Sequence, residues 1–111
     1  MEPIRRSKEF YRQVRAVLSD ESKWVQGTLA KDSQGRACLT DSPDACCWCL
    51  IGACLKAAGP LVLPLGTLGY TWQELFPEVC AITPVPDQLN DNGTYEDVMG
   101  VLDLAIERAE A

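Results

Sequence analysis

Apolar residues recur at helical spacing near both ends of the chain. The first such stretch predicts a helix over residues 3–18, with arginine and lysine side chains on its outer face. Its inward stripe consists of Ile4, Phe10, Tyr11, Val14, Val17 and Leu18. The second stretch predicts a helix over residues 95–109, capped by Thr94. Its inward positions are Val98, Val101, Leu102, Ala105 and Ala109. We expect both amphipathic helices to pack on one core.

A nearly continuous apolar stretch lies between them, in the segment DACCWCLIGACLKAAG (residues 44–59). Asp41 or Ser42 can cap a helix here, Pro43 suits its first position, and the final glycine can end it. The pattern therefore predicts one helix over residues 43–58. A helix that is apolar on every face belongs at the centre of a domain, and this one is shorter than the about 20 residues that span a bilayer.

The remaining segments predict shorter elements and loops. Residues 24–40 hold two β-favouring runs around the turn signal DSQG, which is typical of a hairpin. Residues 71–74 form a capping box that predicts a short helix, interrupted by Pro77. Residues 59–70 predict an apolar loop, and residues 82–93 predict an extended, turn-rich segment.

Length and composition fit a single domain over residues 1–111. Apolar residues make up 47% of the chain and charged residues 23%, as in globular proteins. The predicted fold is mainly α with a minor α+β part: a compact helical domain around the central apolar helix, with a short β-hairpin. The N-terminal residues are charged where an export signal would be apolar, which predicts a cytoplasmic protein with reduced thiols.

The net charge of −6 is unevenly distributed. Residues 1–23 carry six basic and four acidic side chains, whereas residues 71–111 carry one basic and nine acidic side chains. This balance argues against direct nucleic-acid binding and predicts a protein partner with a basic surface. No interaction with a membrane is predicted.

Two surfaces are candidates for binding that partner. One is an acidic face on the last helix, formed by Glu96, Asp103, Glu107 and Glu110. The other is the apolar loop, through Leu63, Leu65 and Leu68. The leading hypothesis is a non-enzymatic binding or inhibitory protein that acts through one of these surfaces. A plain solvated helix face is the alternative interpretation of the carboxylates, because such stripes are common on surface helices.

The chain contains no histidine. This absence removes the usual catalytic triads and most catalytic zinc sites. Any active site would have to use cysteine, carboxylate, lysine or tyrosine side chains, and we predict no catalytic residue and no cofactor.

Six cysteines leave three interpretations open. Cys46 and Cys49 form a Cys-x-x-Cys that could serve thiol-redox chemistry at a helix N-terminus. The same pair, with Cys38 and Cys80, could hold a structural zinc ion. The favoured interpretation is that the cysteines are small apolar residues that let neighbouring helices approach closely.

The segment NDNG (residues 90–93) is expected to turn the chain and cap the last helix, and its buried side chains could bond to the central helix. A third functional hypothesis is a small-molecule pocket between this turn and the central helix. Its predicted lining is Trp48, Cys49, Asn90 and Asp91.

The chain resembles an uncharacterised family of small bacterial and phage proteins. The resemblance rests on WVQGTLAKDSQGR, on CCWCLIGA and on LNDNGTYEDVMGVLDLAIERA. It implies a compact α-rich domain and no known activity or cofactor. It places these residues at motif positions: Trp48, Cys49, Gly52, Ala53, Asn90, Asp91, Thr94, Asp97 and Val98. Additional cysteines at positions 46 and 54 depart from the family pattern.

Overall fold

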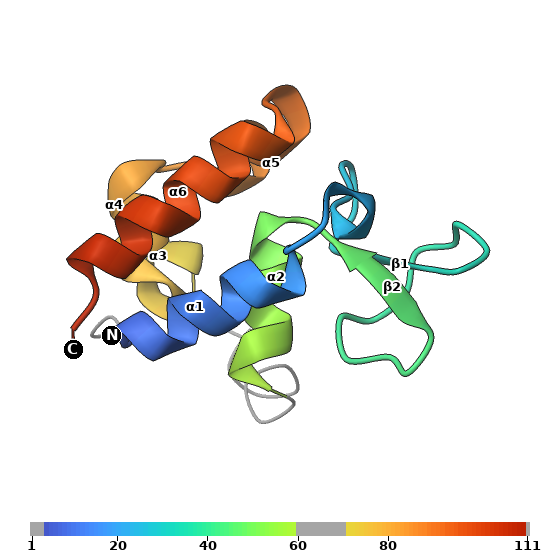
Figure 1. Cartoon of the computed structure of the whole chain (residues 1–111), viewed down its shortest axis with the longest axis horizontal. Coiled ribbons are helices and arrows are strands. Elements are labelled where there is room, and N and C mark those ends of the chain that lie inside the picture. Colours follow the sequence, from blue (N-terminus) through green and yellow to red (C-terminus); the bar gives the residue numbers. More distant parts are fainter. Residues whose placement is uncertain (1–3, 60–70, 111) are drawn as a thin grey trace.

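The computed structural model describes residues 4–59 and 71–110 (Figure 1). In these residues the chain forms α1 (Lys8–Val17), α2 (Leu50–Ala58), α3 (Trp72–Leu75), α4 (Pro77–Ile82), α5 (Pro86–Asn92) and α6 (Tyr95–Arg108). A 3-10 turn, η1 (Glu21–Lys23), and two strands, β1 (Ala30–Asp32) and β2 (Ala45–Trp48), complete them. The mainly α fold with a small antiparallel sheet is confirmed. The predicted binding residues Leu63, Leu65 and Leu68 lie outside the described residues.

Helix α1 begins later than predicted. Ser7 is its N-cap and accepts a hydrogen bond from the backbone N–H of Phe10 (3.1 Å), so the helix starts at residue 8 instead of residue 3. Ile4 precedes the helix, and its backbone N–H donates to the carbonyl of Glu74. The inward stripe is confirmed from Phe10 to Leu18, because Tyr11, Val14 and Leu18 are completely buried. The prediction is wrong at Ile4, which precedes the helix and is 36% exposed.

The predicted central helix is correct only in its second half. Residues Ala45–Trp48 form strand β2, which pairs antiparallel with β1, and Cys49 is the N-cap of α2. The helix-start signal at Ser42 forms a turn instead: the Ser42 carbonyl accepts from the backbone N–H of Ala45 (3.1 Å). From Leu50 onward the prediction holds, because residues 50–55 are all buried.

The turn of the predicted hairpin is confirmed, but its second strand is wrong. The Asp32 backbone N–H donates to the carbonyl of Arg36 (2.9 Å), and Gly35 adopts a positive φ of 78° in the turn between them. The returning chain makes a bridge between Lys31 and Ala37, and the Cys38 backbone N–H donates to the carbonyl of Ala30 (3.1 Å), but this part of the chain does not form a strand. The continuous partner of β1 is β2, which follows a longer connection.

The C-terminal part contains two more helices than predicted. Pro77 was expected to interrupt the helix that starts at Thr71, but it begins a further helix, α4. Pro86 begins α5 at a position where its missing N–H costs nothing, so the segment predicted to be extended is helical from Pro86 to Asn92. Helix α6 follows the prediction, with Thr94 and Asp97 forming a capping box. Its predicted inward residues are all buried: Val98, Val101, Leu102, Ala105 and Ala109.

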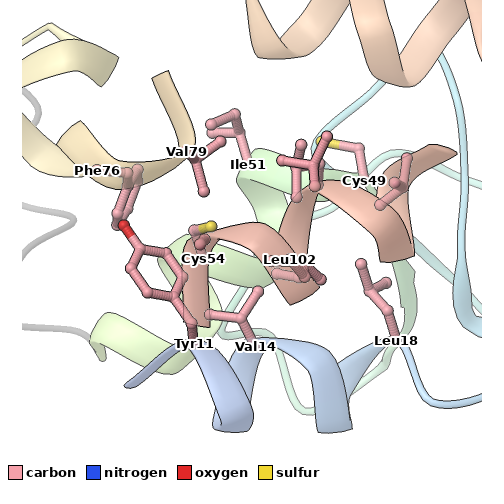
Figure 2. Packing of buried hydrophobic residues seen from close by; sticks show 14 of the residues in the cluster. Tyr11, Val14, Leu18, Cys49, Ile51, Cys54, Phe76, Val79 and Leu102 are labelled. Carbon is pink, nitrogen blue, oxygen red and sulfur yellow. The ribbon is translucent and has the colours of Figure 1, made fainter. Parts of the chain in front are cut away.

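The core lies where α1, α2, α4 and α6 meet (Figure 1). Figure 2 shows Tyr11 and Val14 on α1 and Leu18 at its C-cap, with Leu102 of α6 opposite them. Cys54 of α2 lies in the middle of this cluster. Among residues 4–59 and 71–110, no helix is both long enough and apolar enough to cross a bilayer.

Candidate functional site

Asn90 on α5 joins three separate segments of the chain. Its side-chain oxygen accepts from the backbone N–H of Leu50 (2.9 Å) and from the indole N–H of Trp24 (2.6 Å). Its amide group donates to the carbonyl of Val25 (3.0 Å) and to the carboxylate of Asp91 (3.1 Å). Two donors and two accepted bonds exhaust the capacity of an amide side chain. Asn90 is only 1% exposed and all its hydrogen-bonding groups have partners within the chain, so this junction serves to hold the three segments together.

The loop before β1 is fastened to the end of α5 by further hydrogen bonds. The side-chain amide of Gln26 donates to the carbonyls of Asn90 (3.0 Å), Asp91 (3.0 Å) and Gly93 (3.2 Å). The Asp91 carboxylate accepts from the backbone N–H of Gly27 (2.9 Å). These bonds satisfy carbonyls that the end of a helix leaves without partners.

Gly52 is required where this loop crosses α2. A Cβ atom built at Gly52 would lie 1.9 Å from the backbone oxygen of Leu29. The same oxygen accepts from the backbone N–H of Cys49 (3.1 Å). The contact is backbone against helix, so a side chain at position 52 would have to push the loop away.

The predicted pocket residues Trp48, Cys49, Asn90 and Asp91 therefore lie around this junction. The Trp48 indole N–H donates to the carbonyl of Thr40 (2.9 Å), and the sulfur of Cys49 accepts from the backbone N–H of Gly52 (3.2 Å). The expectation that the NDNG segment bonds to the central helix is confirmed at Asn90. The helix cap that it was also expected to supply comes from Thr94.

The cysteines fall into two groups. Cys49, Cys54 and Cys80 are buried, and burial raises the pKa of each thiol, that of Cys80 to about 11. Such thiols stay protonated near neutral pH and are poor nucleophiles. Cys46 is exposed on β2, and the two remaining cysteines are half-buried: Cys47 on the same strand and Cys38 in the connection before it.

The structure does not assemble the four-cysteine zinc site. Within residues 4–59 and 71–110, no three cysteine, aspartate or glutamate side chains lie together as metal ligands would. The helix-terminal Cys-x-x-Cys is also absent, because Cys46 lies in a strand and only Cys49 reaches the start of α2.

A second buried polar cluster was not predicted from the sequence. The Tyr11 hydroxyl donates to the Glu78 carboxylate (2.7 Å), which also accepts from the backbone N–H of Arg6 (3.2 Å). The Arg6 guanidinium lies over the rings of Phe10 (4.7 Å) and Phe76 (5.2 Å). Burial, followed by the bond to Glu78, raises the pKa of Tyr11 above its ordinary range. No periodicity could reveal this cluster, since Tyr11 and Glu78 are 67 positions apart.

An open hollow of about 280 Å³ lies beside this cluster. Its lining consists of Arg5, Pro77, Glu78, Ala81, Arg108 and Glu110. Glu110 was predicted to lie on the acidic helix face, but α6 ends at Arg108. Glu110 forms a backbone bridge with Ser7, and its carbonyl accepts from the backbone N–H of Lys8 (2.8 Å). It therefore leaves the acidic face and joins this hollow.

The outer face of α6 retains three of the four predicted carboxylates. Glu96, Asp103 and Glu107 are all exposed. Asp103 pairs with Arg15 of α1 (2.7 Å). Leu104, which is 44% exposed, lies next to Asp103 and was missed by the sequence analysis. Its position off the inward stripe was the signal available for finding it.

The motifs that meet at the junction and along α6 extend over most of the chain. A family model with the description "Family of unknown function (DUF6197)" matches residues 3–108. The chain belongs to this family. No curated protein and no solved structure matches it. Since the family description assigns no activity, the use of these surfaces has to be argued from their geometry.

Proposed function

We propose that this member of the family is a non-enzymatic binding protein that uses the outer face of α6 to engage a basic surface on a protein partner. The observation that carries the proposal is the composition of this face. It presents the carboxylates of Glu96, Asp103 and Glu107 with the exposed side chain of Leu104 beside them. Carboxylates around an apolar contact combine electrostatic steering with buried area, as in many protein interfaces.

The charges on this face differ in availability. Among the described residues, no cation lies within ion-pairing distance of Glu96 or Glu107. Asp103 shares its charge with Arg15, but this pair is exposed, and an exposed pair contributes at most about 1 kcal/mol. A basic partner could therefore take all three carboxylates at little cost to the fold.

The residues at the family's motif positions hold the fold together, and this supports a binding surface over a catalytic centre. Asn90 has no hydrogen-bonding capacity left, Gly52 admits a backbone crossing, and Thr94 with Asp97 caps α6. We therefore propose that the motif positions shared with small bacterial and phage proteins preserve the junction and the start of α6. Carboxylates spaced along a helix can imitate the phosphates of a nucleic acid. They would therefore suit an inhibitor that occupies the phosphate-binding surface of a host or defence protein.

The test is affinity capture from a lysate with paired charge reversals. Glu96→Lys with Glu107→Lys reverses two exposed charges that form no ion pair with the described residues. Glu21→Lys with Asp41→Lys provides a matched control on other exposed sites. We expect a protein retained by wild type and by the control, released by added salt, and bound about tenfold more weakly by the α6 variant. Equal capture by all three chains would refute the proposal.

A further inference from the structure

The small sheet has an irregular register at Cys46 and Cys47, which are adjacent in β2. Lys31 of β1 pairs with Cys47, but Asp32, the next residue of β1, pairs with Ala45. Cys46 is therefore the extra residue of a β-bulge and has no partner on β1. In a regular strand, adjacent side chains point to opposite faces, and a bulge breaks this alternation.

Both thiols of this pair are accessible from the surface. Cys46 is exposed and Cys47 is half-buried, with its sulfur 3.9 Å from the carbonyl of Lys31. The two thiols are also close enough to interact: burial and the neighbouring Cys46 thiol together raise the pKa of Cys47. The remaining cysteines of α2 and α4 are buried and cannot compete for a reagent in solution.

Covalent geometry decides what such a pair can bind. Adjacent Cα atoms are about 3.8 Å apart across a trans peptide, whereas disulfides usually span about 4.4–6.8 Å between Cα atoms. A direct bond between the sulfurs of Cys46 and Cys47 is therefore strained, and the pair is expected to persist as two thiols. A single atom inserted between the sulfurs relieves this strain, because it lengthens the bridge by one bond.

The number of protein ligands at this site determines which atom can bridge the two sulfurs. Zinc in structural sites takes four ligands, and the described residues bring no three cysteine or carboxylate side chains together. A monosubstituted trivalent arsenical needs only two sulfur ligands and prefers thiols over oxygen or nitrogen donors. We propose that Cys46 and Cys47 form a bidentate site for trivalent arsenicals on the exposed bulge of β2.

The reaction is a condensation without oxidation or reduction. An arsenoxide, R–As=O, reacts with both thiols: two S–H bonds and the As=O bond break, while two As–S bonds and two O–H bonds form. The product is a cyclic dithioarsenite on Cys46 and Cys47, and one water molecule leaves. Arsenic remains trivalent throughout, so no external oxidant or reductant is required.

Phenylarsine oxide is a suitable probe, with intact-protein mass spectrometry of the full chain in the presence of excess glutathione. Closing the second As–S bond is intramolecular, which strengthens binding roughly 100-fold over a single bond. In the presence of glutathione, we expect wild type to retain one phenylarsenic group and to lose two hydrogens. Under the same conditions Cys46→Ser and Cys47→Ser should lose the phenylarsenic group to glutathione. The control variant Cys38→Ser, which removes the half-buried thiol of the neighbouring segment, should retain it.

Circular dichroism of each variant keeps the result interpretable, because serine replaces sulfur at exposed or half-buried positions and the helices should be unchanged. Retention by folded Cys46→Ser would overturn the proposal, as would loss in Cys38→Ser or the absence of a glutathione-resistant adduct on wild type. Mild oxidation with glutathione disulfide tests the strain argument separately. An internal disulfide between Cys46 and Cys47 that forms readily would contradict the proposal.

Discussion

The junction at Asn90 allows the most quantitative prediction. Replacing Asn90 with alanine removes four hydrogen bonds at a site that is 1% exposed. The backbone N–H of Leu50 and the indole N–H of Trp24 then lose their acceptor. A buried donor without a partner costs about 1–3 kcal/mol. The Leu50 donor is buried and the Trp24 donor belongs to a half-buried residue, so the two together should cost about 3 kcal/mol. This is a large part of the about 5–15 kcal/mol that stabilises an ordinary domain.

Urea unfolding followed by tryptophan fluorescence measures this loss, and Trp24 is itself part of the junction. With a typical urea dependence for a small protein, the midpoint should fall by about 2 M. Asn92→Ala is the matched control, because Asn92 is an exposed asparagine on the same helix. Its stability should stay within about 0.5 kcal/mol of wild type. If Asn90→Ala unfolds at the same urea concentration as Asn92→Ala, the junction does not stabilise the fold and the reasoning is refuted.

Two further predictions concern the packing and the buried tyrosine. Gly52→Ala should destabilise the protein by about 1–3 kcal/mol in thermal unfolding, because its Cβ would collide with the backbone of Leu29. Gly100→Ala has open space around its Cβ and should stabilise the protein by about 0.5–1 kcal/mol. Equal shifts for both variants would contradict the close contact between Leu29 and α2. Tyr11→Phe removes the bond to Glu78 and should cost about 1.5–3 kcal/mol near neutral pH. The pKa of Tyr11 is raised in the folded state, so wild type should lose stability as the pH rises above about 10, where the unfolded chain ionises this tyrosine. Tyr11→Phe should lose less stability over the same pH range. Parallel pH profiles of the two proteins would contradict this assignment.

Local signals in the sequence were sufficient for the helices that carry their own caps. The capping boxes at Thr71 and Thr94 each join residues three positions apart, and both helices begin where these signals predict. The stripe on α1 and the inward face of α6 follow from helical periodicity, which depends only on residues within one or two turns. These features need no knowledge of the rest of the chain.

The segment from Ala45 to Trp48 shows where local signals fail. Its cysteines, alanine and tryptophan suit a strand or a buried helix, and the capping signals before it favoured the helix. The strand forms because these residues pair with β1, whose partner residues lie 13 to 18 positions earlier in the chain. The same pairing places the bulge at Cys46, so the candidate dithiol site could not be derived from sequence spacing.

The sequence by itself therefore determined the helical class, the core faces of α1 and α6, and the acidic character of the C-terminal part. Only the tertiary structure decided how these parts are connected: Asn90 bonds to Leu50, 40 positions away, and Glu110 leaves the acidic face to meet Ser7. The physical reason is that a hydrogen bond or a packing contact between distant residues leaves no periodic trace in the chain. It exists only after folding has brought both partners together.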